Sequence, residues 1–247
     1  MVTKRMVAAW TLAAVLAAAS AVGAQMRADL ALLPAPTPIA AVARCGPVRT
    51  DYDDAWDAML GAAALEREAA KRSLRVLEDS LAAVAEERHA DAELRWILAA
   101  VTGARAEVEG GRDQIEAAKA AHARAREVLA LDPNHPGAKH LIGRLHLEVL
   151  RMSRIKRFLA TKVLGGGELM GATWEEARRL LEAGVVGDPC STDHHYQLAR
   201  LYSETGDAQL ARERLRWVLR MPPASARDSV VVVRAAELMD ALDAGSR

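Results

Sequence analysis

Residues 193–223 read DHHYQLARLYSETGDAQLARERLRWVLRMPP and predict two helices joined by a tight turn. Apolar or small residues recur at intervals of three and four on both sides of Gly206, as they do along the buried face of a helix. Gly206 provides the backbone freedom that a helix end needs. The small Ala199 and Ala211 allow two helices to approach closely. The stretch therefore predicts an antiparallel helix pair that ends at Pro223.

The same spacing occurs upstream of this pair. Pro189 and Ala177 lie 34 residues before Pro223 and Ala211, and Pro133 closes an earlier unit. This period, with a small residue in each helix and a closing proline, is typical of the tetratricopeptide repeat. One such pair cannot bury its own apolar face, so it needs neighbours. We therefore predict an all-α fold in which tetratricopeptide-like antiparallel helix pairs stack as a short right-handed solenoid.

The pattern divides the chain of 247 residues into three parts. These are a signal peptide at 1–24, a Pro-rich linker at 25–50 and a helical repeat domain at 51–243. The domain consists of units at about 51–90, 91–135, 136–191 and 192–225, followed by a capping helix at 229–242. The third unit is longer than the others, and its extra residues predict an inserted helix at 145–164 that ends in a turn at Gly165-Gly166-Gly167.

Charge and motifs restrict the class of function. The chain has 33 basic and 33 acidic residues, so we predict no nucleic-acid partner, because phosphate binding requires a basic excess. No Ser-His-Asp order, paired carboxylates or HExxH motif is present, and we predict a non-catalytic protein with no cofactor and no metal. His194 and His195 are adjacent and do not share a helix face, so a buried core histidine is the simpler interpretation of His195.

The N-terminus has the three parts of a secretory signal peptide. Lys4 and Arg5 precede an apolar run, and small residues lead to Ala24. The alternative is an uncleaved membrane anchor, because the segment from Met6 to Ala24 has 19 residues. The small residues before Gln25 favour cleavage after Ala24. We therefore predict an exported protein, most simply a periplasmic or secreted one.

The two cysteines lie far apart in the sequence. Cys45 belongs to the linker, and Cys190 belongs to the turn between two repeat units. An oxidising compartment would allow them to form a disulfide, which would stabilise the fold by about 4 to 5 kcal/mol in the chain-entropy model. The alternative is two unpaired thiols.

The first helix of each pair is expected to line a concave groove. Offsets from the packed positions Leu198 and Ala199, transferred to the preceding unit, give eight residues that face this groove. They are His140, Arg144, Leu147, Glu148, Tyr196, Arg200, Ser203 and Glu204. Arg144 and Arg200 occupy equivalent positions and together would suit a carboxylate, such as a peptide C-terminus. The alternative is that both arginines are only solvated or pair with Glu148 and Glu204.

The inserted helix has its own alternatives. Its basic residues alternate with apolar ones, which is typical of an amphipathic helix at an anionic membrane surface. The lipid-contact candidates are Arg151, Arg154, Lys156, Arg157 and Phe158. The simpler interpretation is a helix whose apolar side packs under its neighbours. A phosphate-binding loop at the three glycines is disfavoured, because no Lys-Ser/Thr follows them.

Residues 91–223 resemble the regulator of microtubule dynamics family and its bacterial tetratricopeptide relatives. The most specific parts are ATWEEA at 172–177 and HYQLARLY at 195–202. The resemblance implies a compact helical repeat domain used for binding, without catalysis. Animal members are linked to microtubules, and one is linked to lipid handling at organelle contacts. A signal peptide would separate this chain from tubulin, so only the fold and a binding role carry over.

We therefore predict an exported, non-catalytic scaffold that binds a protein or peptide through its concave groove. Binding to a lipid or a membrane surface through the helix at 145–163 is the alternative. A third hypothesis, a hydrolase or metalloenzyme, is supported by the histidines alone.

Overall fold

The computed structural model describes residues 45, 51–153, 167–223 and 225–245. Every regular element in these residues is a helix, which confirms the all-α prediction for this part of the chain. The elements are α2 (Asp53–Ala63), α3 (Arg67–Glu87), α4 (Ala92–Val108), α5 (Gly111–Leu131), α6 (Pro136–Arg151), α8 (Gly167–Met170), α9 (Trp174–Gly187), α10 (Thr192–Glu204), α11 (Ala208–Arg220) and α12 (Ala226–Ala244). The signal peptide predicted at 1–24 lies outside the described residues, as does the linker at 25–50 except for Cys45.

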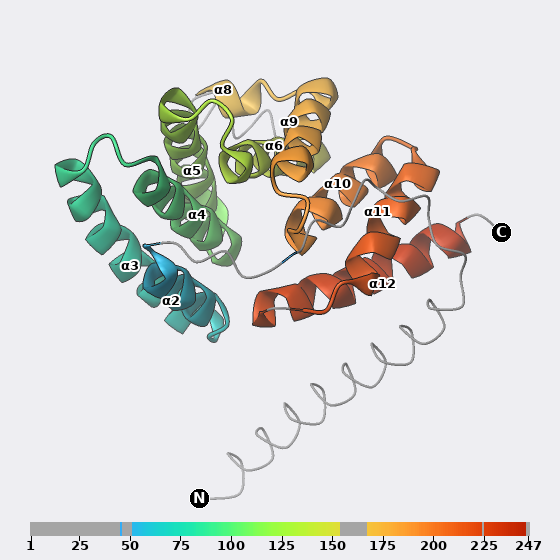
Figure 1. The fold of residues 1–247 in the computed structure, drawn as a ribbon, viewed down its shortest axis with the longest axis horizontal. Coiled ribbons are helices and arrows are strands. Elements are labelled where there is room, and N and C mark those ends of the chain that lie inside the picture. The colour runs from blue at the N-terminus through green and yellow to red at the C-terminus, as the bar shows by residue number, and fades with distance from the viewer. Residues whose placement is uncertain (1–44, 46–50, 154–166, 224, 246–247) are drawn as a thin grey trace, which may run out of the picture.

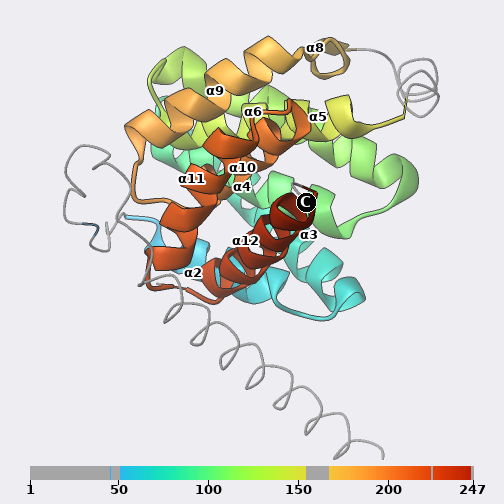
Figure 2. The ribbon, with the colours of Figure 1, turned by 90° about the vertical axis from the view of Figure 1, so that its right-hand side faces the viewer.

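Helices that follow one another along the chain pack side by side, except that α9 packs on α6 and the short α8 packs on α5 and α6. Figure 1 shows them arranged as an arch, with α2 and α3 at one end and α12 at the other. In the view of Figure 2, α2, α3 and α12 lie in the lower half of the molecule, below α6 and α9. The two ends of the chain of helices therefore lie on the same side of the arch. None of the helices in the described ranges combines the length and apolarity needed to cross a membrane.

Local signals determine where several helices begin and end. Thr173 accepts a hydrogen bond from the backbone N–H of Glu176 at 3.2 Å, and Ser191 accepts one from His194 at 3.3 Å. These side chains satisfy N–H groups that have no partner within the first turn of α9 and α10. Gly206 takes a φ of 86° in the turn between α10 and α11, a conformation that residues with a Cβ rarely adopt.

Small residues at the helix contacts allow close packing. Ala199 of α10 and Ala211 of α11 have no exposed surface. A Cβ added to Gly143 of α6 would lie 2.8 Å from Cγ of Leu181 on α9, too close for two carbon atoms. The contact between α6 and α9 therefore depends on the missing side chain at Gly143.

The prediction of one continuous helix at 145–164 is wrong, because the helix ends near the middle of this range. Helix α6 ends at Arg151, and Met152 has an extended backbone with a φ of −63° and a ψ of 141°. The N–H of Met152 donates to the carbonyl of Val149 at 3.2 Å, which closes the last turn of the helix. No glycine or proline lies at this end of the helix. The periodic pattern of apolar residues continues past it, and for this reason the sequence predicted a longer helix. Residues 154–164, together with Gly165 and Gly166, lie outside the described part of the chain.

The C-terminal helix is longer than predicted. It was expected at 229–242, whereas α12 begins at Ala226 and ends at Ala244. Ser225 caps it by accepting from the backbone N–H of Asp228 at 3.1 Å. The cap precedes the apolar residues from which the helix was predicted, which explains the earlier start.

Cys45 and Cys190 form a disulfide with their Cα atoms 5.4 Å apart. Of the two alternatives left open by the sequence, the structure therefore has the paired one. The bond joins the segment before α2 to the turn between α9 and α10, across 145 residues of sequence. The disulfide therefore links two parts of the arch that contacts between consecutive helices do not join directly.

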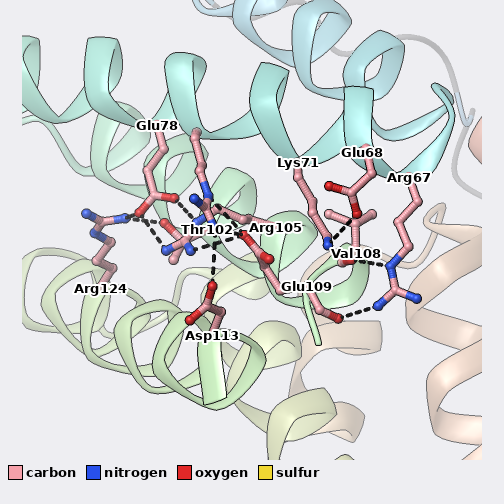
Figure 3. A network of polar contacts seen from close by, with 11 residues as sticks. Arg67, Glu68, Lys71, Glu78, Thr102, Arg105, Val108, Glu109, Asp113 and Arg124 are labelled. Carbon is pink, nitrogen blue, oxygen red and sulfur yellow. Dashed lines mark hydrogen bonds and ion pairs between the residues drawn. The ribbon is translucent and has the colours of Figure 1, made fainter. Parts of the chain in front are cut away.

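A polar network fixes α3 to α4 and α5 (Figure 3). The buried Glu78 of α3 accepts hydrogen bonds from Arg105 of α4 and Arg124 of α5. Burial raises the pKa of the Glu78 carboxyl, but these two guanidinium groups more than offset it and hold the pKa below its ordinary value. Glu109 is also buried and lies 2.6 Å from Arg75. Each buried carboxylate thus has the charged partners that it needs.

Candidate functional site

A cavity of about 1760 Å³ lies on the concave side of the arch. Residues from α2, α4, α5, α6, α8, α10 and α12 line it. Leu60 of α2 and Leu238 of α12 belong to the same lining, although they come from opposite ends of the helical array. The cavity therefore extends from one end of the arch to the other.

Six of the eight residues predicted to face the groove line this cavity. They are Arg144, Glu148, Tyr196, Arg200, Ser203 and Glu204. Residues 144 and 148 come from α6, and the other four come from α10. The structure thus brings together most of the set that was derived from repeat spacing.

The other two predicted groove residues, His140 and Leu147, are buried in the core. Leu147 has no exposed surface and packs in a cluster with Leu181 and Leu198. The ring of His140 stacks on that of His194, with centroids 4.1 Å apart. The offsets fail here because α6 packs against α4, α5, α8, α9 and α10. Neighbours therefore cover faces of α6 that are open in α10.

Ion pairs connect the cavity faces of α6 and α10. Arg200 lies 2.8 Å from Glu148, and Arg151 lies 2.6 Å from Glu204. Arg144 pairs with Glu107 of α4. Arg144 and Arg200 therefore line one cavity, but each of them already forms an ion pair with a carboxylate of the protein. This corresponds to the paired alternative, with Arg151 in place of Arg144 as the partner of Glu204.

Asp193 of α10 joins three helices at one end of this row. Its carboxylate lies 3.2 Å from Nε2 of His140 on α6 and 3.1 Å from the guanidinium of Arg227 on α12. The guanidinium of Arg144 lies farther away, at 4.0 Å. Burial raises the pKa of Asp193, but the charge of Arg227 and the hydrogen bond with His140 outweigh it and hold the pKa well below its usual range. Asp193 is therefore ionised and stabilises the docking of α12.

The adjacent histidines have structural contacts. His195 stacks on Trp217 with ring centroids 3.8 Å apart, and its Nε2 lies 3.0 Å from the carbonyl oxygen of Pro189. Burial lowers the pKa of His195 to about 4. Nδ1 of His194 lies 3.1 Å from the carbonyl oxygen of Gly184. Within the described ranges, no group of three or more His, Cys, Asp or Glu residues is arranged to hold a metal ion.

The family model for regulator of microtubule dynamics protein 1-3 matches residues 60–243, about three quarters of the chain. The chain belongs to this family. The match begins in α2, at a residue that lines the cavity, and ends in α12. The match to the regulator of microtubule dynamics family therefore spans all of the residues that line the cavity. Among curated proteins, none matches the chain.

Helix α12 is the part of the family region whose contribution the sequence did not reveal. It was expected only as a cap, but five of its residues line the cavity. They are Arg227, Val230, Val231, Arg234 and Leu238. Their spacing of three and four residues marks one helix face. Nothing in the sequence shows that this face turns toward α10, because that depends on the contacts of Asp193 and Arg227.

Only one of the five lipid-contact candidates lies in the described part of the family region. Arg151 is 3.6 Å from Glu148 and 2.6 Å from Glu204, so it contributes to the row of ion pairs. Arg154, Lys156, Arg157 and Phe158 lie outside the described residues.

Proposed function

We propose that this protein is an exported, non-catalytic scaffold that binds a protein or peptide partner in its concave cavity. Its helix pairs would form a short right-handed solenoid of the tetratricopeptide type, in which neighbouring units build one continuous concave surface. The observation that carries the proposal is the cavity of about 1760 Å³ between α2 and α12.

The composition of the cavity wall supports a peptide-like ligand. Ligand sites combine apolar surface with a few polar groups that determine orientation. The larger apolar residues of the wall are Leu60, Ile115, Leu145, Val149, Met152, Leu169, Met170, Val230, Val231 and Leu238. The ion-paired residues of α6 and α10 lie beside them. A polypeptide offers both kinds of group, because its backbone is polar and many of its side chains are apolar.

Two features support export. The N-terminal residues have the composition of a signal peptide. Cys45 and Cys190 are paired, and disulfides persist in oxidising compartments and are rare in the cytosol. Microtubules, which give the family its name, are not proposed as partners here, because an exported chain would not meet tubulin.

Filling the cavity tests this proposal. Ser203 lines the cavity and is partly exposed, so Ser203→Trp would occupy the space where a partner binds. Val76 on α3 is 67 % exposed and lies outside the cavity lining, so Val76→Trp is the matched control. The bait is the mature chain from Gln25, used in a pull-down from the exported fraction. Partners recovered with the unmodified chain and Val76→Trp are expected to be lost with Ser203→Trp. Equal recovery with both variants would exclude the cavity as the binding site.

Binding to a lipid or a membrane surface through residues 145–163 is the alternative proposal. Cosedimentation with anionic vesicles at low salt tests it. Vesicle binding that persists in Ser203→Trp and disappears in an Arg154→Glu, Arg157→Glu double variant would favour this alternative over the cavity.

A further inference from the structure

The cavity wall is more basic than the protein as a whole. Six arginines and four carboxylates line it, whereas the complete chain has no net charge. The arginines are Arg112, Arg144, Arg151, Arg200, Arg227 and Arg234, and the carboxylates are Glu107, Glu148, Asp193 and Glu204. An excess of positive charge in a concave site favours anionic ligands.

Carboxylates of the protein already neutralise most of these arginines. Four of the six pair with the carboxylates of the wall, as Arg144 does with Glu107 and Arg227 does with Asp193. Arg112 lies 3.6 Å from Glu116, and both side chains are exposed. No carboxylate in the described ranges lies within ion-pairing distance of the guanidinium of Arg234. In the described part of the wall, Arg234 is therefore the cation that is free to bind a ligand.

The surroundings of Arg234 combine apolar and polar groups. Val230 precedes it by one helical turn on α12 and is 50 % exposed, and Leu238 follows it by one turn. Tyr196 of α10 lines the same wall. The guanidinium of Arg200 lies 6.0 Å from the centre of the Tyr196 ring. Burial raises the pKa of the Tyr196 hydroxyl, and the charges of Arg200 and Arg234 partly offset this.

We infer that Tyr196, Val230, Arg234 and Leu238 form a subsite for an acidic peptide, in which a carboxylate lies beside an aliphatic side chain. The guanidinium of Arg234 would bind the carboxylate through two parallel hydrogen bonds, and Val230 and Leu238 would contact the aliphatic group. This inference rests on the proposed function, because it specifies which peptides the cavity binds. A basic peptide is disfavoured, because it would place its charge next to an unpaired arginine.

Selection from a display library of short random peptides tests the inference. The mature full-length chain, its Arg234→Glu variant and the control Arg72→Glu serve as baits. Arg72 is exposed on α3, outside the cavity lining. The unmodified chain and the control are expected to enrich peptides with Asp or Glu next to Leu, Ile or Val. Arg234→Glu is expected to lose these peptides and to enrich Lys and Arg instead.

Calorimetry with a synthetic peptide of the enriched sequence gives the second measurement. We expect Arg234→Glu to weaken binding about tenfold or more and Arg72→Glu to leave it unchanged. Arg234→Gln, which removes the charge without reversing it, replaces the glutamate variant if the latter does not fold. Enriched peptides without acidic residues, or equal binding to the Arg234 variant, would overturn the inference and leave the proposed function standing. If no peptide is enriched on any bait, both fail.

Discussion

Arg200 on α10 lies 2.8 Å from Glu148 on α6, and this pair connects the two helices in the lining of the cavity. Arg151 and Glu204 repeat the contact at 2.6 Å about one turn farther along, with the signs exchanged between the helices. Because the charges alternate along each helix, sliding one helix past the other by a turn would place like charges together. The row of ion pairs therefore favours one register of α6 against α10.

This pair predicts a measurable coupling. Arg200 is mostly buried and Glu148 is about half exposed, so the interaction is expected to contribute about 0.5 to 1 kcal/mol to the free energy of unfolding. Urea unfolding of Glu148→Ala, Arg200→Ala and the double variant measures it as a double-mutant cycle. The coupling should shrink at high salt, where the charges are screened. Purely additive losses would show that the pair does not stabilise the fold.

Asp193→Asn is expected to destabilise the protein far more than a surface change. It removes the charge that compensates Arg227 and Arg144, and leaving one side of a partly buried ion pair without its partner costs roughly 1 to 3 kcal/mol. Asp79→Asn on the exposed surface of α3 is the control and should change the free energy of unfolding little. Similar urea midpoints for the two variants would contradict the central role of Asp193.

Two glycines in helices should respond in opposite directions to alanine. Gly143→Ala would place a Cβ 2.8 Å from Cγ of Leu181, so we expect a loss of about 1 to 3 kcal/mol in the free energy of unfolding. Gly61 has no atom within 4 Å of the added Cβ, so Gly61→Ala should stabilise α2 by about 0.5 to 1 kcal/mol. Thermal and urea unfolding measure both. Equal effects would indicate that α6 and α9 pack less closely than described.

Burial of His195 predicts a loss of stability in acid. Its pKa is about 4 in the folded protein, against an ordinary value of 6.5, so the unfolded chain binds the proton more tightly. The free energy of unfolding should therefore be level above pH 6.5 and should fall between pH 6.5 and 4, by roughly 3 kcal/mol from this residue. His195→Phe keeps a ring against Trp217 and cannot titrate, so its slope over this range should be shallower. An unchanged slope would assign the effect to other groups.

Reduction of the disulfide should lower stability substantially. A bond that closes a loop across 145 residues contributes about 5 kcal/mol in the chain-entropy model. Dithiothreitol is therefore expected to shift the urea midpoint of the unmodified chain downward. A Cys45→Ser, Cys190→Ser variant should already unfold at the lower midpoint and should not respond to the reductant. A midpoint that reductant leaves unchanged would contradict this prediction.

The sequence predicted features that depend on local signals. The glycine turn at 206 and the small residues at 199 and 211 are each defined by a few neighbouring residues. Their period along the chain was enough to place α9, α10 and α11. Six of the eight residues predicted to face the groove line the cavity, because their positions depend on helix periodicity within α6 and α10.

The remaining features depend on contacts between distant segments. Leu147 was predicted to face the groove, but α9 and α10 cover it, and their positions relative to α6 are not encoded in the residues beside Leu147. The partner of Arg144 comes from α4, where a carboxylate 37 residues earlier had no visible relation to it. The end of α6 at Arg151 has no breaker residue, and the cavity face of α12 depends on the pairing of Arg227 with Asp193.

The bond between Cys45 and Cys190 also determines what a single proteolytic cut can do. Cleavage at any one peptide bond between residues 46 and 189 leaves two pieces that remain covalently joined, because each piece carries one of the two cysteines. The piece with α12 stays attached to the segment that precedes α2, and the two walls of the cavity do not diffuse apart. The protein would therefore tolerate a single nick in this region and would lose a wall of the cavity only after a second cut.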